Sequence, residues 1–459
     1  MGKEYDDYQE GELPWVKSIP SHWQWLRNGV FLCNHLEKVG TRFGEYQLLS
    51  LTTTGVKEKN INQVAGKVPE SYESYQKVFR GDMVFCLFDL DCSAVFSGLS
   101  DFDGMITSAY DVAKPREDIV NPRFLKYWYD SVFTGRYYKI FSKSVRYTIN
   151  YDSFKTIKTP VPPKPEQDQI VRYLDWKTSE IDRFIHQKKK QIKRLEELKK
   201  RKIDDIVTTG LDSVIERKKT KASWMGKVPN TWVECRLKNL FREINVRSEK
   251  GLEPHLSMSQ KKGLVTDDEV IERRLLSESY AGAKICEKDD LVLNRLKAHL
   301  GVFALAPITG IVSPDYTVLR LNKKKVVPKY LEYLLKSNAC RGELVTRVRG
   351  IVEGFWRLYT EDLGAIPVCI PDLEEQQKIL DEITKVDDDV KGLIDAINSE
   401  IELLQELRTK IIADVATGQI DVRDEIIPEC DNTEDIEPED ELENETDNEE
   451  ESEDEERRW

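Results

Sequence analysis

Residues 15–23 read WVKSIPSHW, and residues 224–232, displaced by 209 positions, read WMGKVPNTW. Residues 162–167, PPKPEQ, recur at the same offset as residues 371–376, PDLEEQ. Further pairs in the same order are Leu49-Ser50 with Leu256-Ser257, Glu73-Ser74-Tyr75 with Glu278-Ser279-Tyr280, Gly81–Val84 with Asp289–Val292, and Phe124–Tyr127 with Tyr330–Tyr333. Their register drifts by only a few residues, as loop insertions produce. The sequence therefore predicts two copies of one structural unit.

Each half ends in a segment that is predicted to form one long helix. Apolar residues recur at steps of three, four and seven in the first half, at Ile170, Leu174, Ile181, Ile185, Ile192 and Leu195. The second half keeps a three/four alternation, at Ile379, Ile383, Val386, Val390, Ile394, Ile397, Ile401 and Leu404. This spacing is typical of coiled coils. Each apolar stripe needs a partner, so we expect the two helices to pack on each other, antiparallel if the halves are related by pseudo-twofold symmetry.

The boundaries of these helices are marked in the sequence. Prolines precede them, and Gly210 and Gly418 follow them, which are typical start and stop signals. A continuous helix over residues 166–206 is on the order of 60 Å long, at about 1.5 Å per residue. It is therefore long enough to act as a spacer.

The remainder of each half is predicted to be an α+β module. Short apolar runs indicate strands at 83–85, 291–293 and 316–319, and the patterns near 124–131 and 330–337 indicate short helices. The predicted fold class is therefore α+β, with two pseudo-repeated modules and two long helices that form an antiparallel coiled coil.

The net charge of −14 is unevenly distributed. Residues 424–459 contain 20 Asp/Glu and two Arg, a charge of −18, so that residues 1–423 carry +4. A like-charged segment with almost no aromatic residues cannot bury enough apolar surface to fold, and we expect this tail to be disordered. Two roles stay open for it: a solubilising tail, or a segment that mimics DNA or binds a partner. The rest of the chain is mildly basic.

The eight cysteines are scattered, without a C-x-x-C pair or a histidine at zinc-finger spacing. Neither structural zinc nor a disulfide framework is favoured, and we expect reduced thiols. The chain also lacks an apolar run of about 18 residues and a signal-peptide core at its amino terminus. These features predict a cytoplasmic protein without a membrane anchor.

We find no pattern that predicts a catalytic or metal site. The string nearest to an adenine methyltransferase motif, Ser313-Pro314-Asp315-Tyr316, has one proline and the wrong first polar residue, and is interpreted as a turn. A phosphate-binding P-loop is absent. Asp372, Glu375 and Lys378 lie at a predicted helix start, where acids are common, and Glu166 is interpreted in the same way. We therefore predict a protein that is not an enzyme.

The doubled motifs resemble a known family, the specificity subunits of type I restriction-modification systems. The resemblance covers residues 11–424 and depends on the two Trp motifs, the two Pro-x-x-x-Glu-Gln helix starts and the ending Val415–Arg423. It implies five parts: residues 1–165, an N-terminal segment and target recognition domain 1; 166–210, a central coiled-coil helix; 211–371, a linker and target recognition domain 2; 372–423, a C-terminal coiled-coil helix; and 424–459, the acidic tail.

The resemblance also implies function and partners. Each recognition domain reads one part of a bipartite site in double-stranded DNA, and the coiled coil sets the gap between the parts. Two modification (methyltransferase) subunits and further restriction (translocase/nuclease) subunits dock on such a chain. S-adenosylmethionine, ATP and Mg²⁺ are expected on those partners, with no cofactor bound by this chain. The alternative is a coiled-coil scaffold that tethers partners without reading a sequence.

Base and phosphate contacts require Arg, Lys, Asn, Gln and small hydroxyls, so loops at matching places in the two halves are the candidates. The first loop pair holds Thr52, Thr53, Thr54 and Lys57, and Ser259, Gln260, Lys261 and Lys262. A second site, in the distal module, holds Asn294, Arg295 and Lys297, whereas the matching stretch 86–91 is acidic. The third pair holds Lys143, Arg146 and Tyr147, and Arg347, Arg349 and Arg357. Because these loops differ, the two modules are expected to prefer different sequences.

Overall fold

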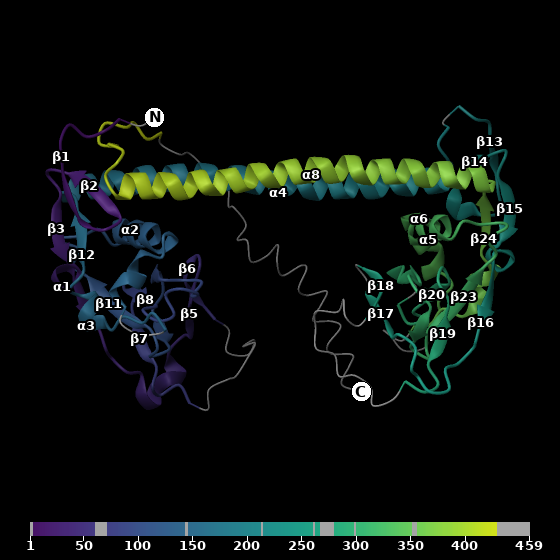
Figure 1. Cartoon of the computed structure of the whole chain (residues 1–459), viewed down its shortest axis with the longest axis horizontal. Coiled ribbons are helices and arrows are strands. Elements are labelled where there is room, and N and C mark those ends of the chain that lie inside the picture. The colour runs from purple at the N-terminus through teal and green to yellow at the C-terminus, as the bar shows by residue number, and fades with distance from the viewer. Residues whose placement is uncertain are drawn as a thin grey trace. The chain divides into compact units, whose positions relative to one another are not determined.

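The computed structural model describes residues 3–59, 71–142, 146–212, 214–259, 262–266, 280–297, 300–350 and 356–428. The chain divides into two compact units (Figure 1). Unit 1 combines the residues up to Lys189 with those from Asn398 onward, and unit 2 is Lys190–Ile397. This division cuts both long helices, so that each unit contains a part of each.

Unit 1 is built from short strands and helices. Its elements before the long helix are β1 (Tyr8–Leu13), β2 (Val16–Pro20), β3 (Gln24–Arg27), α1 (Asn28–Phe31), β4 (Leu32–Asn34), η1 (Gly40–Glu45), β5 (Leu49–Thr52), β6 (Gly55–Glu58), β7 (Gln76–Val78), β8 (Met83–Phe85), β9 (Ser97–Leu99), β10 (Gly104–Ile106), β11 (Asp111–Pro115), α2 (Pro122–Thr134), η3 (Tyr137–Phe141), α3 (Tyr151–Phe154) and β12 (Lys158–Val161). A four-stranded sheet has the order β4-β11-β8-β9, and strand pairs form between β1 and β2, β3 and β12, β5 and β6, and β7 and β10. All of these pairings are antiparallel.

Unit 2 repeats this arrangement sheet for sheet. Its elements are β13 (Arg217–Lys219), η4 (Ser223–Met225), β14 (Lys227–Pro229), β15 (Val233–Arg236), η5 (Leu237–Asn239), β16 (Phe241–Ile244), β17 (Leu256–Ser259), β18 (Gly263–Thr266), β19 (Lys284–Cys286), β20 (Leu291–Leu293), β21 (Phe303–Leu305), β22 (Gly310–Val312), β23 (Thr317–Leu321), α5 (Pro328–Lys336), α6 (Asn338–Val345), α7 (Thr360–Ala365) and β24 (Pro367–Ile370). The four-stranded order is β16-β23-β20-β21, and the pairs are β13 with β14, β15 with β24, β17 with β18, and β19 with β22.

The register of the strands repeats as well. Tyr8 pairs with Pro20 in unit 1, and Arg217 pairs with Pro229 in unit 2. The duplication and the α+β fold class are therefore confirmed. The predicted strands at 83–85 and 291–293 are β8 and β20, and the strand predicted at 316–319 is β23, which begins one residue later and extends to Leu321.

Each unit has a large core that includes its Trp motif and the ends of both long helices. In unit 1 the core contains Trp23, residues 170–174 of the first long helix and residues 412–416 of the second. In unit 2 it contains Trp232 and residues of the opposite helix ends, among them Val207 and Ile379. A smaller core fills the space next to the four-stranded sheet in each unit. The ends of the long helices are thus part of the core of each module.

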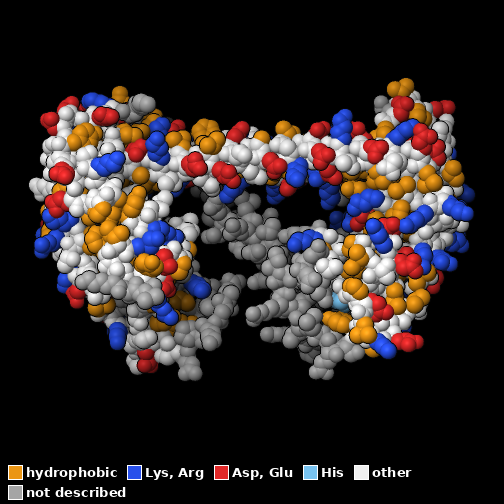
Figure 2. All heavy atoms as spheres, in the orientation of Figure 1, with side chains coloured by type: hydrophobic (Ala, Val, Ile, Leu, Met, Phe, Trp, Pro, Cys, Tyr) orange, Lys and Arg blue, Asp and Glu red, His pale blue; other side chains and the backbone are white. Residues whose placement is uncertain are grey.

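The long helices are α4 (Lys164–Thr209) and α8 (Leu373–Ala416). In unit 1, Lys188 pairs with Glu400, and Asp182 pairs with Arg408, so the residue numbers rise along one helix as they fall along the other. In unit 2, Lys199 pairs with Asp387, at an Nζ–Oδ1 distance of 3.0 Å. The helices are therefore antiparallel partners, as predicted. Figure 2 shows acidic and basic side chains interspersed along them.

The predicted apolar stripe lies in this helix pair. Near the modules its residues are buried, as Ile181 and Ile383 are, while Ile192 and Ile394 are half-buried. Glycine ends both helices: Gly210 has φ +81° and packs on Trp232, and Gly418 has φ +73° and packs on Trp23. A residue with a Cβ is strained at such a φ, which explains these stop signals.

Candidate nucleic-acid interface

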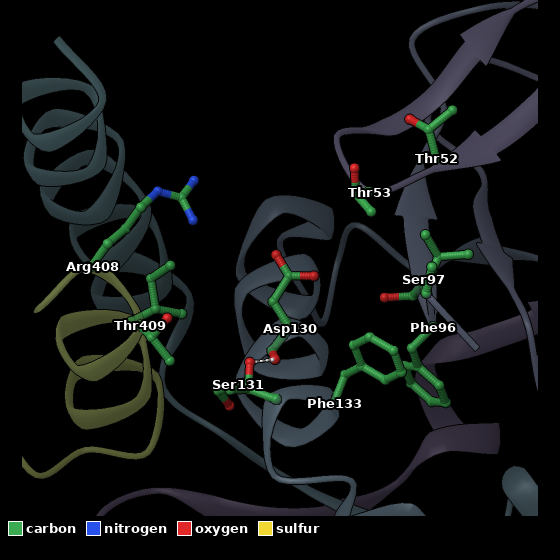
Figure 3. Close-up of a pocket in the computed structure, with 13 residues that line it drawn as sticks. Thr52, Thr53, Phe96, Ser97, Asp130, Ser131, Phe133, Arg408 and Thr409 are labelled. Atoms are coloured by element: carbon green, nitrogen blue, oxygen red, sulfur yellow. Dashed lines mark hydrogen bonds between the residues drawn. The ribbon is translucent and has the colours of Figure 1, made fainter. Parts of the chain in front are cut away.

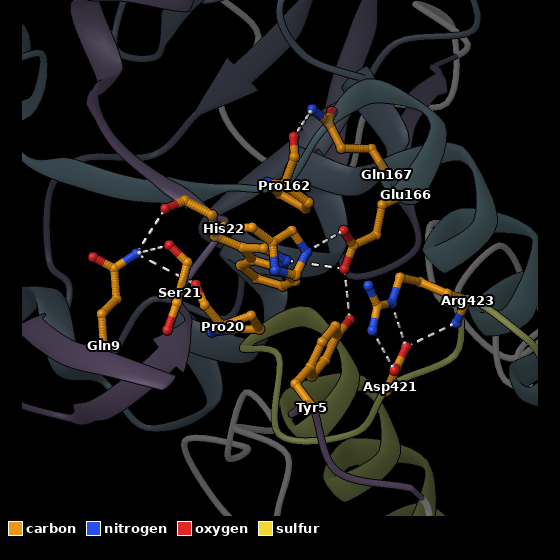
Figure 4. A network of polar contacts seen from close by, with 11 residues as sticks. Tyr5, Gln9, Pro20, Ser21, His22, Pro162, Glu166, Gln167, Asp421 and Arg423 are labelled. Carbon is orange, nitrogen blue, oxygen red and sulfur yellow. Dashed lines mark hydrogen bonds and ion pairs between the residues drawn. The ribbon is translucent and has the colours of Figure 1, made fainter. Parts of the chain in front are cut away.

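The first turn of α4 holds the Trp motif of unit 1 (Figure 4). The Glu166 carboxylate is 6% exposed and accepts hydrogen bonds from Tyr5 Oη at 2.7 Å and from Trp23 Nε1 at 2.9 Å. His22 Nε2 lies 2.7 Å from its other oxygen. Burial, followed by the bond to Glu166, raises the pKa of the Tyr5 phenol far above its usual range. Glu166 therefore fixes the entry motif on the long helix.

The same contact recurs in unit 2 with fewer donors. Trp232 Nε1 donates to Glu375 Oε1 at 3.0 Å, and the two residues are 143 positions apart, as Trp23 and Glu166 are. Both glutamates lie in the first turn of their helix, as predicted. Both carboxylates therefore position the Trp motif of their unit on the long helix.

The glutamine that follows each glutamate makes a second repeated contact. Gln167 Nε2 donates to Pro162 O and Ile119 O, and its Oε1 accepts from Asn121 N at 2.6 Å. Gln376 makes the corresponding bonds to Pro371 O, Lys325 O and Val327 N. Each glutamine therefore fixes the loop that starts the main helix of the module, α2 or α5. Sequence reasoning found the Glu-Gln pair but missed these roles, although its recurrence beside the Trp motif was the available signal.

Two loops of unit 2 that are distant in sequence come together. Arg349 and Arg357 face each other as an antiparallel backbone pair, with N–O distances of 2.9 and 2.8 Å. Leu358 N donates to Arg295 O at 3.1 Å, which joins this pair to the loop that follows β20. The structure thus places Arg295, Arg349 and Arg357 in one basic cluster. Asn294 and Lys297 lie in the same loop as Arg295, and Arg347 lies two residues before Arg349.

The charges in this basic cluster are not equivalent. Arg295 pairs with Glu243 at 3.3 Å and donates from Nε to Thr317 Oγ1 at 2.6 Å. Arg349 pairs with Asp362. Arg357 is exposed and has no ion pair among the residues that the structure describes. A phosphate or a base edge would therefore meet Arg357 without competition from a neighbouring carboxylate.

The remaining polar groups of this region are partly engaged. Arg347 Nε donates to Glu343 Oε1 at 2.9 Å, one turn earlier on the chain. Asn294 Oδ1 accepts from Leu296 N at 3.1 Å, which stabilises the bend of its own loop. Base readout by either side chain would require exchange of these bonds.

The corresponding region of unit 1 has the same backbone contact but different side chains. Ile149 N donates to Leu87 O at 2.8 Å, and Leu90 N donates to Tyr147 O at 3.4 Å. Tyr147 has φ +46° and is 41% exposed, and Asp89 has φ +49°. Arg146 is exposed beside Tyr147, whereas Lys143 lies outside the described residues. In this register Leu87 and Thr148 of unit 1 stand at the places of Arg295 and Arg357, so unit 1 has no arginine at either place.

The first pair of predicted loops forms two matching hairpin tips. Thr52 Oγ1 donates to Gly55 O at 2.9 Å and accepts from Thr54 N, so these two threonines stabilise their own turn. Thr53 and Lys57 are exposed. In unit 2, Lys262 N donates to Ser259 Oγ at 3.3 Å across the β17–β18 turn. Gln260 and Lys261, at its tip, lie outside the described residues.

Two further features concern metal binding and membrane spans in the part of the chain that the structure describes. Within them no group of three or more His, Cys, Asp or Glu side chains is arranged to hold a metal ion. None of their helices combines the length and the apolar character that a membrane span needs.

A protein-family model matches part of the chain. Residues 229–403 match the model described as a type I restriction modification DNA specificity domain. The match begins at the end of the second Trp motif and ends within α8, so it covers most of unit 2, including its basic cluster.

Two proteins of Methanocaldococcus jannaschii are similar over longer stretches. The type I restriction enzyme MjaVIII specificity subunit is 27% identical over 286 residues, which are 59% of this chain and 64% of that protein. A second protein, whose name assigns it to the type I restriction enzyme MjaX as its specificity subunit, is 24% identical over 434 residues, covering 90% of this chain and 96% of that protein.

Solved structures also resemble the chain. The HsdS subunit from Thermoanaerobacter tengcongensis aligns with a TM-score of 0.44 and 16% identity, covering 88% of this chain and 98% of that one. A second alignment is with a chain from a structural study of complex assembly and conformational transition of the type I R-M system. It has a TM-score of 0.49 and 16% identity, and covers 88% of this chain and 99% of that one. The family model and the two relatives, rather than these structures, confirm the similarity to type I specificity subunits that the doubled motifs predict.

Proposed function

We propose that this chain is the DNA specificity subunit of a type I restriction-modification complex, in which each module reads one half of a bipartite site. The observation that carries this proposal is the repetition of one module with different exposed loops. The scaffold contacts of Glu166 and Gln167 recur at Glu375 and Gln376, but the loops beside β8 and β20 differ in charge. Two modules with the same scaffold and different exposed loops are suited to recognise the two different halves of a bipartite DNA site.

Within each module, the proposed readers are the exposed polar side chains of these loops. Arginine and asparagine make paired hydrogen bonds to guanine and adenine edges, and lysine and threonine contact phosphates. Arg357, Arg349 and Asn294 are the proposed base-reading candidates of unit 2, while Arg146 and Tyr147 are those of unit 1. The mildly basic charge of residues 1–423 favours the approach of DNA.

The paired helices are proposed to set the number of unread base pairs between the two words. Removing seven residues shortens a helix by about 10 Å, which corresponds to roughly three base pairs of DNA at about 3.4 Å each. Deleting one heptad from α4 together with the facing heptad of α8 should therefore shorten the gap by about three base pairs and leave both words unchanged.

The proposed partners supply the chemistry. Two modification subunits would bring S-adenosylmethionine and methylate adenine, and restriction subunits would bring ATP, Mg²⁺ and nuclease activity. This chain itself performs neither reaction and binds no cofactor. Its proposed contribution is to hold the complex on one DNA sequence.

The deciding experiment is base-resolved mapping of adenine methylation after co-expression of this chain with its candidate modification subunit, compared with each alone. The expected result is one split motif with a fixed gap, present only in the co-expression. An assembled complex that binds S-adenosylmethionine but adds no methylation would favour the alternative, a coiled-coil scaffold that tethers partners. Methylation by the modification subunit alone, at the same sites, would also contradict the proposal.

A further inference from the structure

A small cleft of unit 1 lies between the β5–β6 turn and the last third of α8. It has a volume of about 180 Å³, and its walls come from β5–β6, β9, α2 and α8. Figure 3 shows Thr53, Ser97, Asp130 and Arg408 around the same open space. The cleft therefore joins one predicted DNA-reading turn to the long helix.

The wall of this cleft includes a buried hydroxyl group without a partner. Ser97 is 8% exposed, and its hydroxyl has no partner in the part of the chain that the structure describes. Thr53 and Thr409 line the same space but are exposed, so solvent can satisfy their hydroxyls, and Ser97 carries the only buried hydroxyl without a partner among the described residues of this wall. Buried polar groups in folded proteins are nearly always satisfied by protein, water or ligand. The cleft is thus suited to bind a polar ligand that would satisfy the Ser97 hydroxyl.

Arg408 brings a guanidinium group to the wall of the cleft. Its Nε lies 3.0 Å from Asp182 Oδ1 on α4, an ion pair that partly neutralises the guanidinium, and its terminal nitrogens form no hydrogen bond with a described residue. Asp130 also lines the cleft, but Lys126 Nζ lies 2.7 Å from its carboxylate and balances it. A guanidinium fork beside several hydroxyls is the usual donor set for a phosphate group.

The corresponding place in unit 2 is built differently. Ser97 pairs with Phe85 across β8 and β9, and Phe303 pairs with Leu293 across β20 and β21, so Phe303 takes the position of Ser97. Phe303 is 1% exposed. In unit 2 an aromatic ring therefore fills the place of the buried hydroxyl, and unit 2 does not share the polar wall of this cleft at this position.

We propose that Arg408 of α8, together with Thr53 and Ser97, binds a phosphate group of the DNA backbone. This inference rests on the proposed function, and it adds that a residue of the long helix, outside the recognition module, contacts the DNA. The contact would fix how DNA lies against unit 1 without reading its sequence.

The test uses the full chain in complex with its modification subunits and compares Arg408→Gln with the wild type. DNA affinity is measured as a function of salt. Loss of one phosphate contact should reduce the slope of log affinity against log salt by about 0.9, and weaken binding at low salt by roughly 3- to 10-fold. The methylated motif should stay the same, because the contact is to the backbone.

Two further variants separate phosphate binding from the structural role of Arg408. Asp182→Asn removes the ion pair but keeps the guanidinium, so its salt slope should equal that of the wild type. Ser97→Ala should weaken binding by about 2- to 3-fold. An unchanged slope in a folded Arg408→Gln complex, or an equal loss in Asp182→Asn, would overturn the inference.

The source of the phosphate is tested separately. Inorganic phosphate is added to the complex without DNA, and the melting temperature is followed. A phosphate-dependent rise that Arg408→Gln abolishes, with no change in the DNA salt slope, would assign the cleft to free phosphate and overturn the DNA contact. Failure of the wild-type complex to bind any DNA would instead overturn the proposed function.

Discussion

Unit 1 and unit 2 hold their long helices with the same pairs of residues but with different numbers of bonds. Glu166 meets Tyr5, His22 and Trp23, whereas Glu375 meets Trp232 alone among the described donors. The glutamines beside them make equivalent bonds in both units. The frame has therefore kept the contacts that orient the module, while unit 1 has added further contacts around them.

The exposed loops of the two units differ far more than the frame. Arg295, Arg349 and Arg357 gather in unit 2, whereas the corresponding loops of unit 1 present Asp89, Arg146 and Tyr147. These side chains are exposed or half-buried, so they can change with little loss of core packing. The two units therefore share the contacts that orient each module on the long helices, whereas the side chains of their exposed loops differ. Variants of the shared contacts should change stability, and variants of the loops should change DNA recognition.

The largest effect is expected at the two buried tryptophans. Trp23→Ala and Trp232→Ala each remove a buried aromatic side chain, which costs about 3–5 kcal/mol of unfolding free energy. Each loss should be confined to the unit that carries the change. Hydrogen exchange measured by mass spectrometry, unit by unit, checks this, and exchange that rises equally in both units would contradict the idea of two separate frames.

The glutamates should separate the two units. Glu166→Ala leaves two neutral donors and His22 without their acceptor, and we expect a loss of about 3 kcal/mol or more, against about 1–2 kcal/mol for Glu375→Ala. Urea unfolding of the two variants, followed by tryptophan fluorescence, measures the difference. Equal losses would mean that the added contacts of Tyr5 and His22 contribute no stability.

Arg357→Ala should affect one DNA word only. Loss of a paired contact to a base costs about 1–3 kcal/mol of discrimination, so methylation should spread to sites with a changed base in one half of the motif. The other half and the gap should stay fixed. Lys324→Ala, an exposed lysine of unit 2 outside the basic cluster, is the control and should leave both words intact.

The smallest effect concerns the end of the described chain in unit 1. Burial would raise the pKa of Asp421, but hydrogen bonds from the Arg423 side chain at 2.8 and 2.9 Å and from its backbone N outweigh burial and lower it. The stabilisation is therefore present above about pH 4, the usual carboxyl pKa, and is lost as the pH falls through the lowered value.

Asp421→Asn should thus cost about 1 kcal/mol at pH 7 and progressively less toward pH 3. Melting curves of wild type and variant across this range measure the difference. Asp212→Asn, near the end of α4 in unit 2, is the matched control, since Asp212 accepts only a bond from Val214 N at 2.8 Å. It should cost less than Asp421→Asn, because no arginine pairs with Asp212 among the described residues.

The sequence predicted the duplication, the long helices and their partners because these depend on periodic apolar residues and on helix-stop glycines. It placed the strands of the sheets less completely, since strands of three residues such as β19 and β22 carry too little pattern. Of the candidate site, it found the basic residues of unit 2. It could not show that the loops of Arg295 and Arg357 meet, or that Glu243 pairs with Arg295 and Asp362 with Arg349, because those contacts join residues that are not adjacent in the sequence.

The discontinuity of unit 1 has a consequence for biosynthesis. Its core needs Ile412, Val415 and Val422, whereas unit 2 is one continuous stretch, Lys190–Ile397. At about 5–20 residues per second, a ribosome that has completed the first part of unit 1 needs roughly 10–40 s to reach the missing helix. All residues of unit 2 are therefore synthesised before those of unit 1 are complete. Until the last segment of unit 1 is synthesised, part of the apolar surface of the amino-terminal module stays exposed.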